Sequence, residues 1–302
     1  MSRFSLLCFA VLRNPHGFLL TLALASIATA SPAYCAGIVN VQRNGNTLTI
    51  TGDGAGNRIS IYGSNTKLIV TQADYDDGTV IRGTPSVANF SGDLVVNLNG
   101  GDDRLTIVQQ DLWLNNVTIN SGTGVTEYVY LKYFKIKGNL AITTQATKVS
   151  PFPGDGSSIH LEKVSVDGTI RINTGSGSDN VCVYPEGDDT PKLKGAVSID
   201  TRDGNDNVNV DINGSGLGAS PQIGGALTIR TGAGADKVYL LVKAPSISVD
   251  LGDADDYLQA YKCGTQGGAA SLEGGSGRDT FKNQGANSSL FTRGITGFEV
   301  RY

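Results

Sequence analysis

A strand–turn–strand pattern occurs six times in this chain of 302 residues, and it limits the possible folds more than any other feature. Each copy has alternating apolar residues, a glycine-rich turn, an acid, and a second alternating stretch. Apolar residues always lie nine and seven positions before the acid and two positions after it. The six acids are Asp103, Asp179, Asp206, Asp236, Asp256 and Asp279.

The spacing of these copies is typical of a solenoid. The last five acids are 27, 30, 20 and 23 residues apart, and self-similarity at such periods indicates stacked repeats. Alternation on each side of the turn predicts two short strands per repeat. One repeat cannot bury its apolar face alone, whereas stacked repeats enclose a narrow core between parallel strands. We therefore predict an all-β, right-handed parallel β-helix (a β-solenoid) with about 20–30 residues per coil and capped ends. An antiparallel β-sandwich is the alternative, and the constant orientation of the repeats argues against it.

Weaker copies of the pattern place Asn57, Glu127 and Thr147 where the acid is expected. Residues 37–92 are predicted to form N-terminal cap strands and the first coils, with a hairpin turn at Asn44-Gly45. Residues 93–302 hold the repeats, and a C-terminal cap at about 290–302 would close the core with Phe298 and Val300. Caps are expected because open strand edges promote aggregation.

The first 36 residues differ from the rest and resemble a secretory signal peptide. They have an arginine-containing start, a short apolar run over residues 19–30, and small residues for cleavage after Ala30, Ala33 or Ala36. The run is short for a membrane span, and no further span is predicted after cleavage. We therefore expect a protein secreted to the extracellular space or cell surface, with the periplasm as another compartment.

Net charge limits the partners that the protein can bind, and the cysteine positions indicate how the fold is held together. Removal of the two signal arginines from 24 basic residues leaves 22 against 28 acids, and 22 − 28 gives a net charge of −6. This charge argues against nucleic acid and anionic membranes as partners. Cys182 and Cys263 should lie three coils apart, roughly 14 Å, which is too far for a disulfide bond. A core and backbone hydrogen bonds, not disulfides, must therefore hold the fold.

The turns resemble the haemolysin-type (RTX) calcium-binding nonapeptide, G-G-x-G-x-D-x-U-x, in which U is apolar. Residues 274–282 match the motif throughout, while residues 232–236 and 175–179 keep its central part. The resemblance implies Ca²⁺ ligands at the six repeat acids, helped by Asp203, Asp253 and Asp255. Family motifs follow one another every nine residues, whereas these recur every 20 to 30, so the family's ion cage does not transfer intact.

Two interpretations of the acids stay open. A column of like charges, one per coil, would be relieved by Ca²⁺, which takes six to eight oxygen ligands. Alternatively, each aspartate accepts hydrogen bonds from the amides of its own turn and has no metal. Asn57 and Thr147 favour the second interpretation, because these residues form turns but bind Ca²⁺ weakly.

The chain is more similar to a binding protein than to an enzyme. The motifs of polygalacturonase-like and pectate-lyase-like enzymes are absent, and His160 is the one histidine after the signal segment. The acid pairs at 76–77 and 188–189 lie in expected loops. A polysaccharide lyase or glycoside hydrolase acting on acidic polysaccharide remains the alternative function.

One segment suggests a binding surface. If Val129 and Leu131 face inward, the tyrosines and lysine between them face outward, together with tyrosines from other coils. Aromatic and basic groups on a flat sheet suit a polysaccharide or a surface protein. We predict a secreted, structural or adhesive protein without catalytic activity whose candidate ligand-binding residues are Tyr128, Tyr130, Lys132, Tyr239 and Tyr257.

Overall fold

The computed structural model describes residues 37–64, 67–73, 78–109, 112–148, 156–184, 193–211, 223–261, 263–265, 269–285 and 294–302. These belong to one compact unit, Tyr34–Tyr302. The described residues form strands and turns, and they include no helix that is long and apolar enough to cross a membrane. The predicted signal segment and the acid pairs at 76–77 and 188–189 lie outside the described residues.

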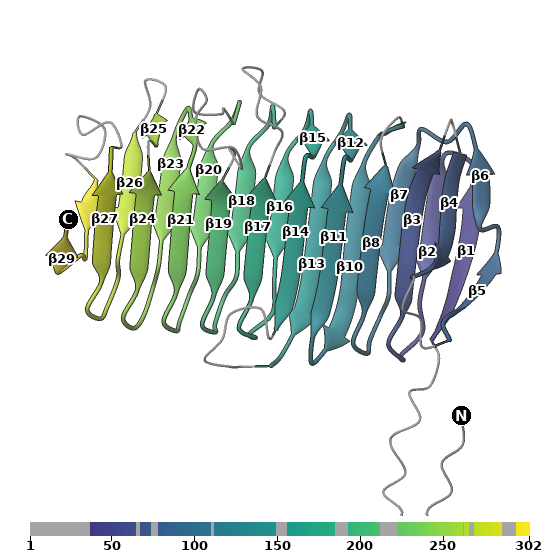
Figure 1. The fold of residues 1–302 in the computed structure, drawn as a ribbon, viewed down its shortest axis with the longest axis horizontal. Coiled ribbons are helices and arrows are strands. Elements are labelled where there is room, and N and C mark those ends of the chain that lie inside the picture. The colour runs from purple at the N-terminus through teal and green to yellow at the C-terminus, as the bar shows by residue number, and fades with distance from the viewer. Residues whose placement is uncertain are drawn as a thin grey trace, which may run out of the picture. The chain divides into compact units, whose positions relative to one another are not determined.

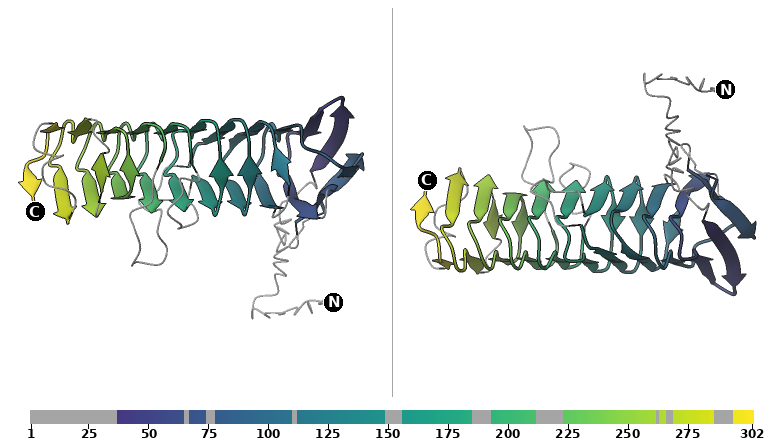
Figure 2. Two further views of the ribbon diagram at one scale, coloured as in Figure 1. Left: turned by 90° about the horizontal axis from the view of Figure 1, so that it is seen from above. Right: turned by 90° about the horizontal axis from the view of Figure 1, so that it is seen from below.

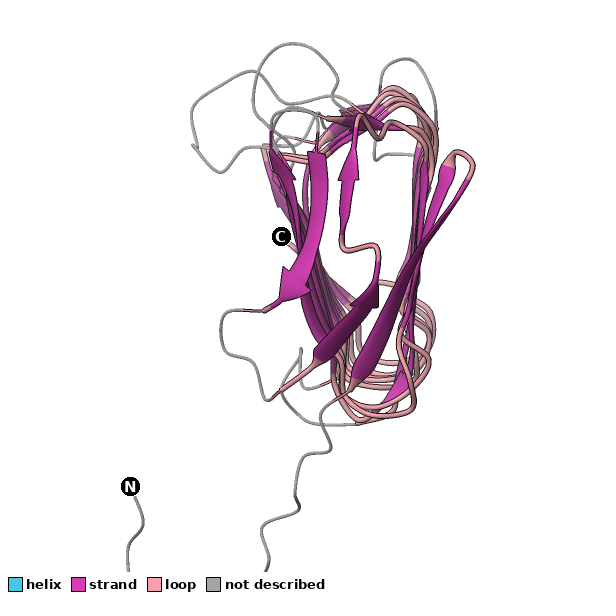
Figure 3. Ribbon diagram, turned by 90° about the vertical axis from the view of Figure 1, so that its right-hand side faces the viewer, coloured by secondary structure: helices cyan, strands magenta, loops and turns pink. Residues whose placement is uncertain are grey.

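Two twelve-stranded sheets face each other along the stack (Figures 1 and 3). The first sheet has the spatial order β28 (Ile295–Thr296), β26 (Ala270–Glu273), β23 (Ile247–Asp250), β20 (Leu227–Arg230), β18 (Val197–Asp200), β16 (Ile170–Asn173), β13 (Leu140–Ala146), β10 (Val117–Gly124), β7 (Asp93–Asn97), β2 (Thr47–Thr51), β1 (Ile38–Asn44) and β5 (Val80–Gly83). The second sheet has the order β29 (Val300–Arg301), β27 (Thr280–Gln284), β24 (Tyr257–Tyr261), β21 (Lys237–Leu241), β19 (Asn207–Asp211), β17 (Asn180–Tyr184), β14 (Ser157–Glu162), β11 (Glu127–Lys132), β8 (Arg104–Gln109), β3 (Arg58–Ser64), β4 (Lys67–Gln72) and β6 (Ser86–Ala88).

A third side of the stack carries two small parallel sheets, seen beside the main strands in Figure 1. They consist of β15 (Ser165–Val166), β12 (Lys135–Ile136) and β9 (Trp113–Leu114), and of β22 (Lys243–Ala244) and β25 (Gly264–Thr265). The chain passes from the first main sheet to the second and back again, so one strand of each makes a coil (Figure 2). The prediction of an all-β architecture with long parallel sheets, compatible with a solenoid, is confirmed.

The register of the parallel strands follows the repeat. In the first sheet Ile170 pairs with Val197, and Val197 pairs with Leu227. In the second sheet Val181 pairs with Val208, which pairs with Val238. All six are buried, so each apolar position of the pattern forms a continuous column through the core. A slip of one residue would turn these side chains to solvent, and the apolar alternation therefore fixes the register.

The N-terminal end departs from parallel pairing. β1 and β2 form the antiparallel hairpin predicted at Asn44-Gly45, in which Asn44 pairs with Thr47. A second antiparallel hairpin joins β3 and β4, and β6 adds to it antiparallel. These hairpins cover the end of the stack, where the open edge would otherwise expose core residues.

Three local details correct or refine the expectations. Ser157, not Thr147, occupies the acid position of its coil, since it pairs with Glu127 in the second sheet. β13 ends at Ala146 and β14 begins only at Ser157, so the acid position of this coil lies further along the sequence than Thr147. At the C-terminal end Phe298 packs on Phe281 with ring centroids 5.6 Å apart. Val300 instead lies in the outward-facing column, beside Thr280.

Candidate functional site

The six repeat acids form one buried column at the turn that leads into the second sheet. Each precedes the first residue of a second-sheet strand, so the strand register places it directly above its equivalent in the next coil. All six side chains are at most 3% exposed. The complete acid column, from N- to C-terminus, is Asn57, Asp103, Glu127, Ser157, Asp179, Asp206, Asp236, Asp256, Asp279 and Glu299.

The carboxylates of this column accept hydrogen bonds from the backbone of the preceding coil. The N–H of Asp179 donates to Asp206 Oδ1 at 2.8 Å, and the N–H of Asp206 donates to Asp236 Oδ1 at 2.7 Å. Asp256 and Asp279 repeat the arrangement at 2.7 and 2.9 Å. The expectation that each aspartate bonds the amides of its own turn is therefore wrong. Each acid instead joins two neighbouring coils.

Backbone geometry explains why an acid is needed there. The backbone carbonyl of each column residue already accepts a hydrogen bond from the next coil. The donor is the N–H of the residue that follows the column position there, as when Lys237 N–H donates to the Asp206 carbonyl at 2.8 Å. The N–H of the column residue lies at the corner of the coil and takes a side-chain carboxylate as its partner in place of a backbone carbonyl. Buried N–H groups in folded proteins are almost always paired, and a short acid satisfies this one.

Burial raises the pKa values of these carboxyl groups. Desolvation raises the pKa of Asp206 to about 8, although the hydrogen bond from the Asp179 amide opposes the shift. It likewise raises the pKa of Asp236 to about 7 and that of Asp256 to about 8. Within the described residues, the Oδ2 atoms of these three acids have no hydrogen-bond partner. A proton on Oδ2 removes the like-charge repulsion that a column of carboxylates would otherwise cause.

The turns that carry the acids are held by glycine. Gly234 has φ +130°, and a Cβ atom there would lie 1.7 Å from the carbonyl oxygen of Gly204 in the preceding coil. No L-residue fits that position without moving the backbone. Close stacking of the coils thus explains why glycine is needed at this position of the motif.

The nine acids proposed as Ca²⁺ ligands separate into two sets. The six repeat acids are buried in the column, whereas Asp203, Asp253 and Asp255 are exposed on the outside of the turns. Asp253 Oδ1 accepts from the Ser276 hydroxyl at 2.6 Å, and Asp255 Oδ1 accepts from the Arg278 amide at 2.9 Å. In the part of the chain that the structure describes, no three His, Cys, Asp or Glu side chains are grouped so as to hold a metal ion. Cys182 and Cys263 are free and buried.

The outward face of the second sheet gathers the predicted ligand-binding residues into two clusters. The first contains Tyr128, Tyr130 and His160, with ring centroids 6.1 to 6.4 Å apart. The second contains Tyr239 and Tyr257, with centroids 5.8 Å apart. We call this outward surface of β11, β14, β17, β19, β21 and β24 the tyrosine face.

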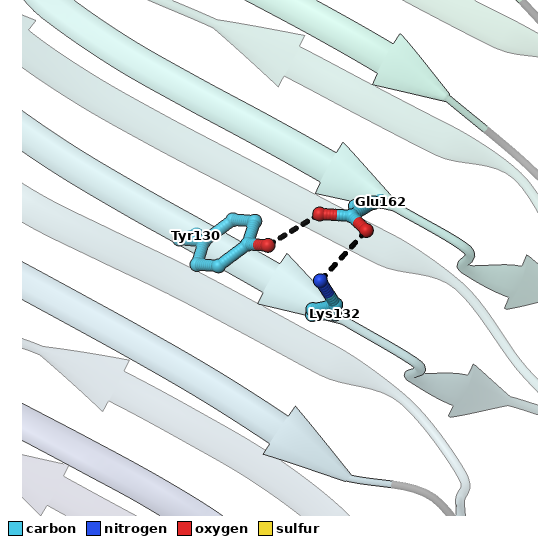
Figure 4. A network of polar contacts seen from close by, with 3 residues as sticks. All are labelled: Tyr130, Lys132 and Glu162. Atoms are coloured by element: carbon cyan, nitrogen blue, oxygen red, sulfur yellow. Dashed lines mark hydrogen bonds and ion pairs between the residues drawn. The ribbon is translucent and has the colours of Figure 1, made fainter. Parts of the chain in front are cut away.

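Charged groups fix the first cluster in place (Figure 4). Tyr130 donates its hydroxyl hydrogen to Glu162 Oε2, and Lys132 Nζ lies 2.8 Å from Glu162 Oε1. These hydrogen bonds lower the pKa of Glu162 and raise that of Lys132. On the other side, the Arg104 guanidinium lies 4.6 Å from the centre of the Tyr128 ring. The cluster is therefore an aromatic surface with cations at both edges.

A shallow cleft of about 340 Å³ adjoins the second cluster. Its lining mixes aromatic, aliphatic and carboxamide side chains: Asn209, Tyr239, Leu240, Leu241, Gln259, Tyr261 and Gln284. Gln259 Nε2 donates to Gln284 Oε1 at 2.8 Å, and Gln259 Oε1 accepts from the Tyr257 hydroxyl at 2.9 Å. Asn209 Nδ2 donates to the Tyr184 hydroxyl at 3.3 Å.

The structure thus brings Tyr128, Tyr130 and Lys132 together, but places Tyr239 and Tyr257 elsewhere on the same face. β11 and β21 are separated by β14, β17 and β19. Four strand spacings correspond to roughly 19 Å. Carboxamides lie between the two clusters, where Asn207 Nδ2 donates to Asn180 Oδ1 at 2.7 Å.

His160 and Glu162 are members of the site that the sequence did not reveal. They pair with Tyr130 and Lys132 across adjacent strands. Their signal was the alternation of the SSIHLEK segment, but the residues between β13 and β14 hid which coil it adjoins. Burial lowers the pKa of His160, so its ring is neutral at neutral pH.

No protein-family model matches this sequence, and neither a curated protein nor a solved structure is significantly similar to it.

Proposed function

We propose that the chain is a secreted, non-catalytic solenoid that acts at or outside the cell surface and binds an extended polysaccharide along the tyrosine face. The observation that supports this best is the pair of aromatic clusters, Tyr128–Tyr130–His160 and Tyr239–Tyr257, on one outward sheet face. A right-handed coil of about 20–30 residues and an RTX-like origin of the turns are part of the same proposal.

The chemistry of the face suits a sugar chain. Tyrosine rings offer an apolar surface with a polar edge, and the carboxamides between the clusters supply both donors and acceptors. The two clusters are roughly 19 Å apart along the stack. A ligand that occupies both must therefore be a chain longer than a disaccharide.

Binding of oligosaccharides of increasing length tests this proposal. A chain that reaches both clusters gains affinity through effective concentration, so we expect affinity to rise steeply once the length exceeds roughly 19 Å. Tyr130→Ala and Tyr239→Ala should each remove that rise, whereas Tyr302→Ala, which removes an exposed tyrosine at the chain end, should not. Calorimetric titration measures all three, with circular dichroism to verify folding.

Two other results would redirect the proposal. Binding of a surface protein at the same tyrosines, with no oligosaccharide binding, would make the molecule a protein adhesin. Release of new reducing or unsaturated ends from the bound polysaccharide would support the alternative of a glycoside hydrolase or lyase.

Calcium stabilisation stays a prediction that the column geometry does not favour. The column carboxylates already accept backbone hydrogen bonds from the preceding coil. An ion would have to use exposed acids such as Asp253 and Asp255.

A further inference from the structure

The outward surface of the first sheet carries a polar pocket that is separate from the tyrosine face. Its volume is about 200 Å³, which is below the roughly 300–1,000 Å³ of most small-molecule sites. The pocket therefore suits one small group, such as a single ring of a sugar chain. Its lining residues are Arg171, Asn173, Ser198, Ile199, Asp200, Thr228 and Arg230. We call it the first-sheet pocket.

The six polar lining residues form two outward rows across three adjacent strands, β16, β18 and β20. The first row consists of Arg171, Ser198 and Thr228. The second row lies two residues further along the strands and consists of Asn173, Asp200 and Arg230. The apolar residues that alternate with these rows are buried, so all six polar side chains face away from the core.

These six polar side chains are not engaged by the protein itself. In the part of the chain that the structure describes, none of them makes a hydrogen bond or an ion pair. The tyrosine face differs in this respect, because there Glu162 already binds Tyr130 and Lys132. The donors and acceptors of the first-sheet pocket are therefore free to exchange water for a ligand.

Arg171 is the cation of this pocket that is best placed to bind an anion. Its neighbours on both adjacent strands are uncharged. Arg230, by contrast, lies between Asp200 and Asp250, which offset its charge. An arginine guanidinium presents a planar set of N–H donors that matches a carboxylate in a bidentate manner. Arg171 is also exposed, so a ligand can reach it from solvent.

The rest of the lining restricts which anion fits. The Asp200 carboxylate repels a group with nearly two negative charges, such as a phosphate monoester, but it accepts hydrogen bonds from ligand hydroxyl groups. The Thr228 hydroxyl can donate or accept. β16 and β20 are two strand spacings apart, roughly 10 Å, which leaves room for one ring between Arg171 and Arg230. This combination matches a ring that carries one carboxylate and several hydroxyl groups.

We propose that the first-sheet pocket binds a uronic acid residue of a polysaccharide, with the carboxylate on Arg171 and ring hydroxyl groups on Asp200 and Thr228. The pocket and the tyrosine face lie on different main sheets. The inference therefore goes beyond the proposed function, because it adds a second sugar site that does not require the tyrosine face to bind.

The test compares two probes, a galacturonate trimer and the galactose trimer obtained by reducing its carboxyl groups, on the full mature chain. In calorimetric titration the wild type should bind the uronate more tightly by about 10-fold or more, which is the contribution of a charge-assisted hydrogen-bond pair. Arg171→Met should reduce the affinity for the uronate to that for the galactose trimer. Arg171→Lys keeps the charge but loses the bidentate geometry, so it should retain only part of the preference.

Arg278→Met is the matched control, because it removes an exposed arginine from a turn outside the pocket. It should leave the preference for the uronate unchanged, and circular dichroism verifies the fold of each variant. Equal binding of the two trimers by the wild type, or a preference that survives in Arg171→Met, would overturn the assignment. A preference that Tyr130→Ala removes and Arg171→Met does not would move the uronate to the tyrosine face.

The outcome for this pocket is distinguishable from that for the tyrosine face. If long neutral oligosaccharides fail to bind while the uronate preference depends on Arg171, the tyrosine face is refuted and the first-sheet pocket is supported. If long oligosaccharides bind through Tyr130 and Tyr239 but the uronate trimer shows no preference, the first-sheet pocket is refuted and the proposed function is supported.

Discussion

Substitution of a column acid by its neutral isostere should change how stability depends on pH. Asp206 is fully buried, and its Oδ1 accepts from the Asp179 amide at 2.8 Å. Asparagine keeps that acceptor and cannot ionise. Asn57 shows that the column accommodates a carboxamide, because its Nδ2 donates to the Ala55 carbonyl at 2.7 Å within the same turn. Asp206→Asn therefore changes charge with little change in shape.

The sign of the effect follows from the direction of the pKa shift. Burial raises the pKa of Asp206 from 3.8 to about 8. Between pH 3.8 and about pH 8, the Asp206 carboxyl group is ionised in the unfolded chain and protonated in the folded protein. The contribution of Asp206 to the free energy of unfolding is thus full below pH 3.8, falls as pH rises, and is lost above about pH 8. The slope is at most about 1.4 kcal/mol per pH unit, which amounts at pH 7 to an upper limit on the order of 4 kcal/mol.

Urea unfolding of the wild type and of Asp206→Asn at about pH 4, 6 and 8 measures this directly. The two should have equal stability within about 1 kcal/mol at pH 4, and the variant should be the more stable at pH 8. Asp203→Asn, an exposed turn acid outside the column, is the matched control. Parallel pH profiles for wild type and Asp206→Asn would refute the reasoning, and would mean that Asp206 is ionised in the folded protein without penalty.

Two further substitutions test the backbone geometry of the turns, and a titration tests whether the protein binds Ca²⁺. Gly234→Ala, whose Cβ would lie 1.7 Å from a backbone oxygen, should lower the free energy of unfolding by about 2 kcal/mol or more; Gly54→Ala, which has open space, should be nearly neutral, and similar losses for both would contradict the stacking argument. Ala254 has φ +93°, so Ala254→Gly should raise the urea midpoint by the equivalent of about 1 kcal/mol, and a lower midpoint would show that the strain is absent. Titration of the chelated protein with Ca²⁺ to about 10 mM should leave the Tm unchanged, with Mg²⁺ as control; a saturable Ca²⁺-specific rise that Asp253→Asn removes would contradict this and place an ion on the exposed turn acids.

Most of the architecture was predictable because the apolar columns repeat with one spacing around the acid. The positions nine and seven before Asp179 and two after it are Ile170, Ile172 and Val181, and all three are buried. The alternation also placed Tyr128 and Tyr130 outward. Coils interrupted by extra residues were less predictable, because the separation between equivalent positions then varies. Hence Thr147 was assigned a position that Ser157 occupies.

The chemistry of the acid column was the harder part. A sequence shows that aspartates recur, but it does not show that the N–H of one coil lies opposite the carboxylate of the next. One expectation for Asp236 was a hydrogen bond from an amide of its own turn, whereas its Oδ1 accepts from the Asp206 N–H at 2.7 Å. Glu127 had matched the pattern with one residue inserted, and the strand register places it in the column next to Asp103.

The column also has a direction. Each N–H donates toward the C-terminus, from Asp206 to Asp236 and from Asp236 to Asp256, and the series ends where the Asp279 amide donates to Glu299 at 2.7 Å. The N–H of an earlier coil therefore depends on an acceptor that lies later in the sequence. A chain truncated after the coil of Asp206 would leave the Asp206 N–H without its carboxylate acceptor.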